Sequence, residues 1–249
     1  MLDRKTKNVI QKQIFSVYRK NQVRAVVLMG SRARGDFNKN SDYDIEVYLK
    51  KKKLRFNSKQ PSLPERNIFI NYTDSRNFNE LKRKGHSFLY CSFRDGIPLH
   101  QDNNWFDRNK REILKLKPSK EIISFYLEAS IERIMSLLKK QGPFYLDYEE
   151  GKSAANQLGF AILMDNNVYP ISPHTLKKEL IILNKKYKKI AESINYIQDI
   201  WYKDKRPNKR KCLKNLNILK NFAMNYVRIN FPKSMEKIKE HEKFLKRIC

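Results

Sequence analysis

The stretch GSRARGDFNKNSDYDIEVYL, residues 30–49, decides the fold of this chain because a glycine-containing turn is followed closely by an acidic strand. The run VRAVVLM at residues 23–29 precedes it, and such an apolar, β-branched run is typical of a buried strand. This run stops at Gly30, where the absence of a side chain lets another group approach the backbone closely. We therefore expect a strand that leads directly into a turn.

A second strand is expected from Tyr43 to Leu49, where polar and apolar residues alternate. Successive side chains of a strand point to opposite faces, so Asp42, Asp44 and Glu46 share one face. Neighbouring carboxylates on that face are about 6.5–7 Å apart at the backbone, at about 3.3 Å per residue. Two like charges this close raise each other's pKa unless a cation lies between them. The pattern therefore indicates a site for divalent metal ions.

In these residues the chain resembles the nucleotidyltransferase superfamily that includes DNA polymerase beta, and in particular the minimal and the aminoglycoside nucleotidyltransferases of prokaryotes. The family pattern is a Gly-Ser pair, an Ala-Arg-Gly-like turn and, after a spacer, Ser-Asp-x-Asp. The matching residues are Gly30, Ser31, Ala33, Arg34, Gly35, Ser41, Asp42 and Asp44. The resemblance is strong over residues 23–49 and extends loosely to residue 100.

The resemblance implies an enzyme that moves a nucleoside monophosphate from a nucleoside triphosphate, with ATP as the expected one, to an acceptor hydroxyl and releases pyrophosphate. Asp42 and Asp44 would hold two Mg²⁺ ions, for which Mn²⁺ can substitute. The residues implied to bind the triphosphate are Gly30 and Ser31, with Arg32 or Arg34 neutralising its charge. The acceptor stays open between a protein side chain, RNA and a small molecule.

Nucleotidyltransferases usually carry a third acidic residue on the next strand, and the expected strand here, NIFINY at residues 67–72, has none. Alternation places Asn67, Phe69 and Asn71 on one face, so either asparagine could stand at the acidic position. An amide can bind a metal ion but cannot accept a proton. Other candidates for the missing carboxylate are Glu46, Glu65, Asp74, Asp147, Glu149 and Glu150, of which the last three also suit the N-terminus of a helix.

The chain has 53 basic and 26 acidic residues, which give a net charge of +27. Such a charge attracts polyanions, so binding of nucleic acid through a basic surface is expected, although a lysine-rich proteome accounts for the charge equally well. The alternatives to an enzyme are a basic RNA-binding protein and a non-catalytic module with a degenerate site, which would bind nucleotide or act like an antitoxin. Three cysteines without metal-binding spacing, no signal-peptide pattern and no membrane-spanning run predict a cytoplasmic protein with no membrane partner.

The expected fold class is α+β, with a small mixed β-sheet followed by a bundle of helices. We expect a nucleotidyltransferase domain over residues 1–104, a linker over 105–118 and an α-helical bundle over 119–249 that would bind the acceptor and form the far wall of the cleft. The elements expected in the first domain are helices at 4–20, at 75–84 and from 87, and strands at 23–29, 43–49, 67–72 and 97–100.

Overall fold

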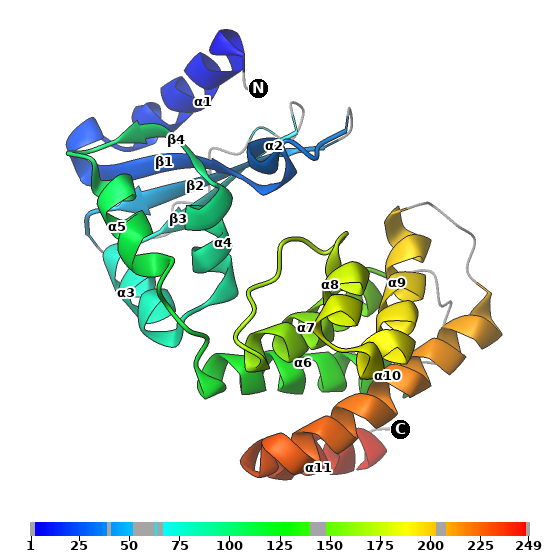
Figure 1. The fold of residues 1–249 in the computed structure, drawn as a ribbon. Coiled ribbons are helices and arrows are strands. Elements are labelled where there is room, and N and C mark those ends of the chain that lie inside the picture. The colour runs from blue at the N-terminus through cyan, green and yellow to red at the C-terminus, as the bar shows by residue number, and fades with distance from the viewer. Residues whose placement is uncertain are drawn as a thin grey trace. The chain divides into compact units, whose positions relative to one another are not determined.

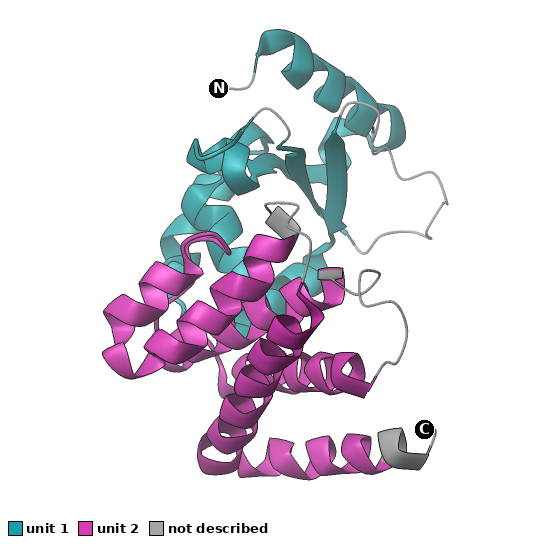
Figure 2. Ribbon diagram, turned by 90° about the vertical axis from the view of Figure 1, so that its right-hand side faces the viewer, with its two compact units in different colours: residues 1–117 teal, residues 118–249 magenta. Residues whose placement is uncertain are grey.

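The computed structural model describes residues 3–38, 41–51, 63, 67–139, 148–202 and 208–247. The chain divides into two compact units, residues 1–117 and 118–249 (Figure 1, Figure 2). The first unit contains a β-sheet and the second consists of helices. The expected α+β class, with a small mixed sheet followed by a helical region, is confirmed.

The first unit is built on a four-stranded sheet in the order β3-β2-β1-β4. The strands are β1 (Val23–Met29), β2 (Tyr43–Leu49), β3 (Ile68–Thr73) and β4 (Ile97–Gln101). Strand β1 is antiparallel to β2 and to β4, whereas β2 and β3 are parallel, so the sheet is mixed. The two central strands are the most apolar ones because both of their faces are covered by helices.

Helix α1 (Arg4–Val17) covers one face of the sheet through Ile10 and Ile14, which pack with the β1 residues Val26 and Leu28. The opposite face is covered by α3 (Ser75–Lys84), α4 (Ser87–Asp95) and α5 (Trp105–Ile113), which pack with β1 and β2 through apolar and aromatic residues (Figure 1). The short elements are η1 (Lys20–Gln22), before β1, and α2 (Gly30–Arg34), which follows it directly. The sheet therefore lies between two helical layers.

Local signals in the sequence explain where the short helices begin and end. The Asp74 side chain accepts a hydrogen bond from the backbone N–H of Asn77 at 2.9 Å and so caps the start of α3. That helix ends at Gly85, which takes the left-handed conformation at φ 58°. His86 caps the next helix, because its Nδ1 accepts the backbone N–H of Phe88 at 3.1 Å. The helix expected at residues 75–84 is thus confirmed.

Helix α5 occupies most of the segment for which a linker was expected. Charged residues and Pro118 suggested an irregular connection over residues 105–118, but Trp105–Ile113 are helical. Phe106 and Ile113 lie seven positions apart, on one face of that helix, and are 1% and 0% exposed. Burial of these two side chains against the sheet, with Trp105 packed beside them, stabilises a helix whose other residues are polar.

The second unit consists of α6 (Lys120–Lys139), α7 (Tyr148–Asp165), α8 (Leu176–Leu183), η4 (Lys185–Tyr187), α9 (Lys188–Tyr202), α10 (Lys209–Asn230) and α11 (Pro232–Arg247). A single apolar core runs through these helices, with Leu127, Leu158, Leu180 and Ile194 among its fully buried residues. Helices α7 and α8 approach closely at Gly159, where a Cβ would lie 2.5 Å from Cδ2 of Leu176. Within the described part of the chain, no helix has the length and apolar content needed to cross a membrane.

Candidate active site

The two halves of the sequence motif meet where β1 ends, because Gly30 lies against Asp44. Met29, the last residue of β1, is paired with Asp44 in the antiparallel register. Gly30 has a φ of 68°, in the left-handed region that favours glycine. A Cβ at this position would lie 2.2 Å from Oδ2 of Asp44. Glycine therefore leaves the room that the Asp44 carboxylate occupies.

Asp42 and Asp44 lie at the start of β2 and differ in exposure. Asp42 precedes the strand and is exposed, whereas Asp44 lies within it and is half-buried. Burial raises the pKa of Asp44, the charge of Asp42 raises it further, and the charge of Arg34 acts in the opposite direction. The two carboxylates repel each other when both are ionised, so a bound cation would stabilise the pair.

These two carboxylates fit a hard divalent cation such as Mg²⁺. Magnesium is usually bound by one or two carboxylates together with phosphate oxygens and water. Among the residues that the structure describes, no third Asp, Glu, His or Cys joins Asp42 and Asp44 in a group that could hold a metal ion. The pair therefore suits an ion whose other ligands come from a bound triphosphate. That two ions bind stays a prediction.

The two arginines of the turn have different surroundings. Arg32 donates from Nε and Nη2 to the backbone oxygen of Ser41 at 3.0 and 2.7 Å, and its guanidinium lies 3.8 Å from the centroid of the Tyr43 ring. Arg34 forms an ion pair with Asp36, with 3.2 Å between Nη2 and Oδ1. Arg32 therefore fixes the loop that carries Asp42, whereas Arg34 is the arginine whose charge acts on Asp44.

Ser31 and Gly35 complete the turn that follows β1. The backbone oxygen of Ser31 accepts the N–H groups of Gly35 and Asp36 at 2.9 and 3.1 Å, which closes α2 after a single turn. Gly35 has a φ of 85° and meets no atom within 4 Å if a Cβ is added. The two glycines thus share a left-handed backbone, but only Gly30 has a close neighbour.

The strand register identifies the residue beside Asp44 on β3, and it is Phe69. The parallel pairing places Phe69 opposite Asp44 and Asn71 opposite Glu46. Asn67 precedes the strand with a left-handed φ of 53°. Neither asparagine therefore stands next to Asp44, and an aromatic side chain that is 42% exposed takes that place.

The other carboxylates considered for the third position have other surroundings or lie outside the described residues. Asp74 caps α3, and Glu149 and Glu150 lie in the first turn of α7, where acidic residues favour the helix dipole. Glu65 and Asp147 lie outside the described residues.

Glu46 shares a strand face with Asp44 but is only 1% exposed. Neither of its carboxylate oxygens has a hydrogen-bond partner among the described residues. Burial raises the pKa of Glu46 to about 7, against a smaller opposing effect of the Thr73 hydroxyl. Alternation placed Glu46 on this face, but its burial depends on helices that arrive later in the chain.

Comparison with known proteins agrees with this geometry. Residues 12–103 match the family model described as "Polymerase beta, Nucleotidyltransferase". These residues are therefore similar to the nucleotidyltransferase domains of the polymerase beta family.

A solved structure titled as a nucleotidyltransferase-like protein from Exiguobacterium sibiricum 255-15 is also similar, with 12% sequence identity and a TM-score of 0.44. The match covers 93% of this chain and 77% of that one. No curated protein sequence matches the chain significantly.

Proposed function

We propose that this protein transfers a nucleoside monophosphate from a nucleoside triphosphate, with ATP as the expected donor, to an acceptor hydroxyl and releases pyrophosphate. The observation that supports this most directly is the contact of Gly30 with Asp44 inside a nucleotidyltransferase domain. A side chain at Gly30 would displace the Asp44 carboxylate. Because this residue is glycine, the carboxylate keeps a position from which it could bind a metal ion that carries a triphosphate. The acceptor class is open between a protein, RNA and a small molecule.

Asp42 and Asp44 would hold Mg²⁺ together with the phosphate oxygens. When bound, Mg²⁺ would offset the charge of the phosphates and polarise the α-phosphorus toward attack. The backbone N–H groups near Gly30 and the Ser31 hydroxyl would donate to the β- and γ-phosphates. Arg34, whose charge acts on Asp44 and which also pairs with Asp36, would neutralise them, whereas Arg32 is engaged with the Ser41 carbonyl.

A non-catalytic nucleotide-binding module is the second candidate, and Phe69 is the observation that favours it. A phenyl ring can neither bind a metal ion nor accept a proton, and it stands beside Asp44 where the family usually has a carboxylate. Such a module would bind the triphosphate without transferring it, as a nucleotide sensor or an antitoxin-like partner would.

One experiment separates the two candidates. The full chain is incubated with each α-labelled nucleoside triphosphate, with Mg²⁺ or Mn²⁺ and cell extract, and the label is traced in protein, RNA and small molecules. We expect one acceptor class to be labelled and the labelling to disappear in Asp44→Asn. The matched control is Asp107→Asn, which removes an exposed carboxylate from α5 outside the site.

Triphosphate binding is measured in parallel by calorimetry, with Mg²⁺ and with a chelator. Under the proposal, binding requires the metal ion and is lost in the double variant Asp42→Asn/Asp44→Asn. Binding without labelling would leave the non-catalytic module as the function. Unchanged affinity in the double variant would refute the assignment of the site.

A further inference from the structure

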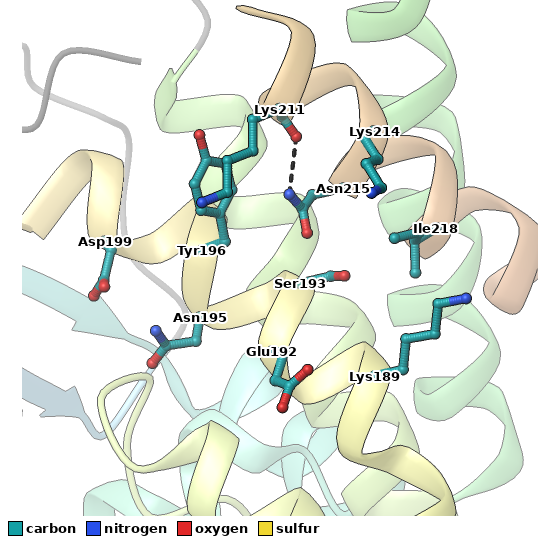
Figure 3. Close-up of a pocket in the computed structure, with 10 residues that line it drawn as sticks. All are labelled: Lys189, Glu192, Ser193, Asn195, Tyr196, Asp199, Lys211, Lys214, Asn215 and Ile218. Carbon is teal, nitrogen blue, oxygen red and sulfur yellow. Dashed lines mark hydrogen bonds between the residues drawn. The ribbon is translucent and has the colours of Figure 1, made fainter. Parts of the chain in front are cut away.

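A pocket of about 630 Å³ lies on the second unit between α9 and α10 (Figure 3). Six of its lining residues are on α9, namely Lys189, Glu192, Ser193, Asn195, Tyr196 and Asp199, and four are on α10, namely Lys211, Lys214, Asn215 and Ile218. The two helices pack through buried apolar residues such as Ile194 and Leu216, so the pocket lies above an apolar layer. Its volume is in the range of small-molecule or single-nucleotide sites.

Three lysines outweigh the two carboxylates, Glu192 and Asp199, in the lining of the pocket. Lys189, Lys211 and Lys214 are exposed, and none of their ammonium groups has an ion-pair partner among the described residues. The adjoining elements add further lysines and an arginine at residues 185, 186, 188, 209 and 210. Unpaired cations in a concave surface create a positive potential that attracts phosphate groups.

An aromatic ring lies within this cationic pocket. Tyr196 is half-buried on α9, and the Lys211 ammonium lies 4.7 Å from the centroid of its ring. Lysines beside an aromatic ring form the combination that proteins use to bind single-stranded nucleic acid, with bases stacked on the ring and phosphates on the cations.

The polar groups of the pocket suit a nucleotide better than a uniformly acidic ligand. The Asn215 amide nitrogen donates to the backbone oxygen of Lys211 at 2.8 Å, which leaves its amide oxygen directed into the pocket (Figure 3). Glu192 is an exposed hydrogen-bond acceptor at the pocket wall. A ribose hydroxyl can donate to such a carboxylate, and a deoxyribose has no 2′-hydroxyl to offer.

We propose that the α9–α10 pocket binds single-stranded RNA, with phosphates on Lys189, Lys211 and Lys214 and a base against Tyr196. Binding of RNA at this pocket does not depend on the proposed transfer of a nucleoside monophosphate. Its test contains no nucleoside triphosphate, so the outcome is independent of transfer activity.

The test measures binding of a fluorescein-labelled 12-nucleotide single-stranded RNA to the full chain by fluorescence anisotropy over a range of salt concentrations. The site variant is Lys189→Gln/Lys214→Gln. Its control is Lys178→Gln/Lys233→Gln, which removes the same charge from exposed positions on α8 and α11. Each phosphate contact contributes about 0.7 to the log-log salt slope for single strands, so the site variant should lower the slope by about 1.4 and the control should leave it unchanged.

Substitutions of Tyr196 test the stacked base. Tyr196→Leu should weaken RNA binding about tenfold, whereas Tyr196→Phe should retain it, because stacking requires the ring and not the hydroxyl. Binding of inorganic polyphosphate should be unaffected by either change. If Tyr196→Leu does not fold, which circular dichroism reports, the lysine variants decide the proposal by themselves.

The sugar is tested with DNA of the same sequence, which should bind more weakly than RNA, and Glu192→Gln should reduce that difference. Equal salt slopes in the site and control variants would overturn the proposal. So would equal binding of RNA, DNA and polyphosphate, because the surface would then recognise charge alone.

Discussion

Gly30 is the residue on which the geometry of the candidate active site depends most directly. Gly30→Ala would place a Cβ 2.2 Å from Oδ2 of Asp44, so the carboxylate or the turn must move. We expect Mg²⁺-dependent triphosphate binding to fall at least tenfold, measured by calorimetry. The control is Gly35→Ala, which imposes the same left-handed strain of about 1–3 kcal/mol where no atom lies within 4 Å. Equal losses in the two variants would mean that backbone strain, and not the Asp44 contact, is responsible.

Glu46 makes the stability of the first unit depend on pH. Its pKa is about 7 in the folded protein, above the ordinary value of 4.5, so the folded state holds the proton more tightly than the unfolded state. The resulting stabilisation is fully present below pH 4.5 and is lost as the pH rises to about 7, with a total of about 3 kcal/mol. Glu46→Gln should remove this dependence and raise the free energy of unfolding at pH 8.

Urea denaturation at pH 5 and pH 8, with a chelator present, measures this effect. Glu236→Gln, at an exposed position on α11, serves as the control and should retain the dependence of the wild type. A Glu46→Gln variant that is less stable than the wild type at pH 8 would contradict the prediction, because it would show that the ionised carboxylate is favourably bound.

The fixed spacing of the motif placed Gly30 and the acidic pair in one predicted site, and the structure brings Gly30 against Asp44, whereas the binding roles of these residues stay predictions. It did not distinguish the roles of Arg32 and Arg34, which lie two positions apart in one turn. Their difference arises from the Ser41 carbonyl and the Tyr43 ring, which both contact Arg32. Contacts made by a returning loop leave no periodic pattern in the sequence.

At the scale of elements, the register of β3 determines which side chain faces Asp44. Phe69→Asp would place a carboxylate beside Asp44, and the exposed position should accept it. If the missing acid limits transfer, this variant should raise the rate of labelling at least tenfold, since a positioned base contributes about 10² or more. Asn71→Asp is the matched control, because it adds the same charge to the same strand face beside Glu46. A rate increase in the control alone would show that the register does not identify the catalytic position.

The strands and the helix at residues 75–84 were predictable because apolar alternation and terminal glycines act locally. Helix α5 was missed because its segment is highly charged and only a few apolar residues favour a helix there. Phe106 and Ile113 are spaced for one helix face, but the benefit of burying them arises only when the sheet is present. The register of β3 against β2 could not be fixed from sequence either, because alternation shows which residues share a face but not which residue of the neighbouring strand each one faces.

At the scale of the whole molecule, the apolar cores belong to separate units. One core is made only of residues from 118–249, and the two cores on the faces of the sheet are made only of residues from 1–117. We therefore expect Leu158→Ala, which creates a cavity in the helical core, to destabilise that unit by about 2–5 kcal/mol. Triphosphate binding at Asp42 and Asp44 should be retained.

Hydrogen exchange followed by mass spectrometry measures whether the two units unfold independently of each other. Peptides from α6 to α10 should exchange faster in Leu158→Ala, and peptides from β1 and β2 should not change. Val26→Ala, in the core of the sheet, is the reciprocal control and should affect the first unit alone. Faster exchange throughout the chain in either variant would show that the two units unfold as one.

Pro98 in β4 has a further consequence for how molecules of this protein meet one another. Strand β4 forms one border of the sheet, and its register against β1 shifts between Val26 and Val27. A proline cannot donate a backbone hydrogen bond, and an irregular border strand offers a poor template for an incoming strand. At the other border, Leu63 exchanges backbone hydrogen bonds with Ile68 at 2.9 and 3.1 Å and covers the start of β3. The β4 border and the start of the β3 border are thus protected against the intermolecular strand pairing that leads to aggregation.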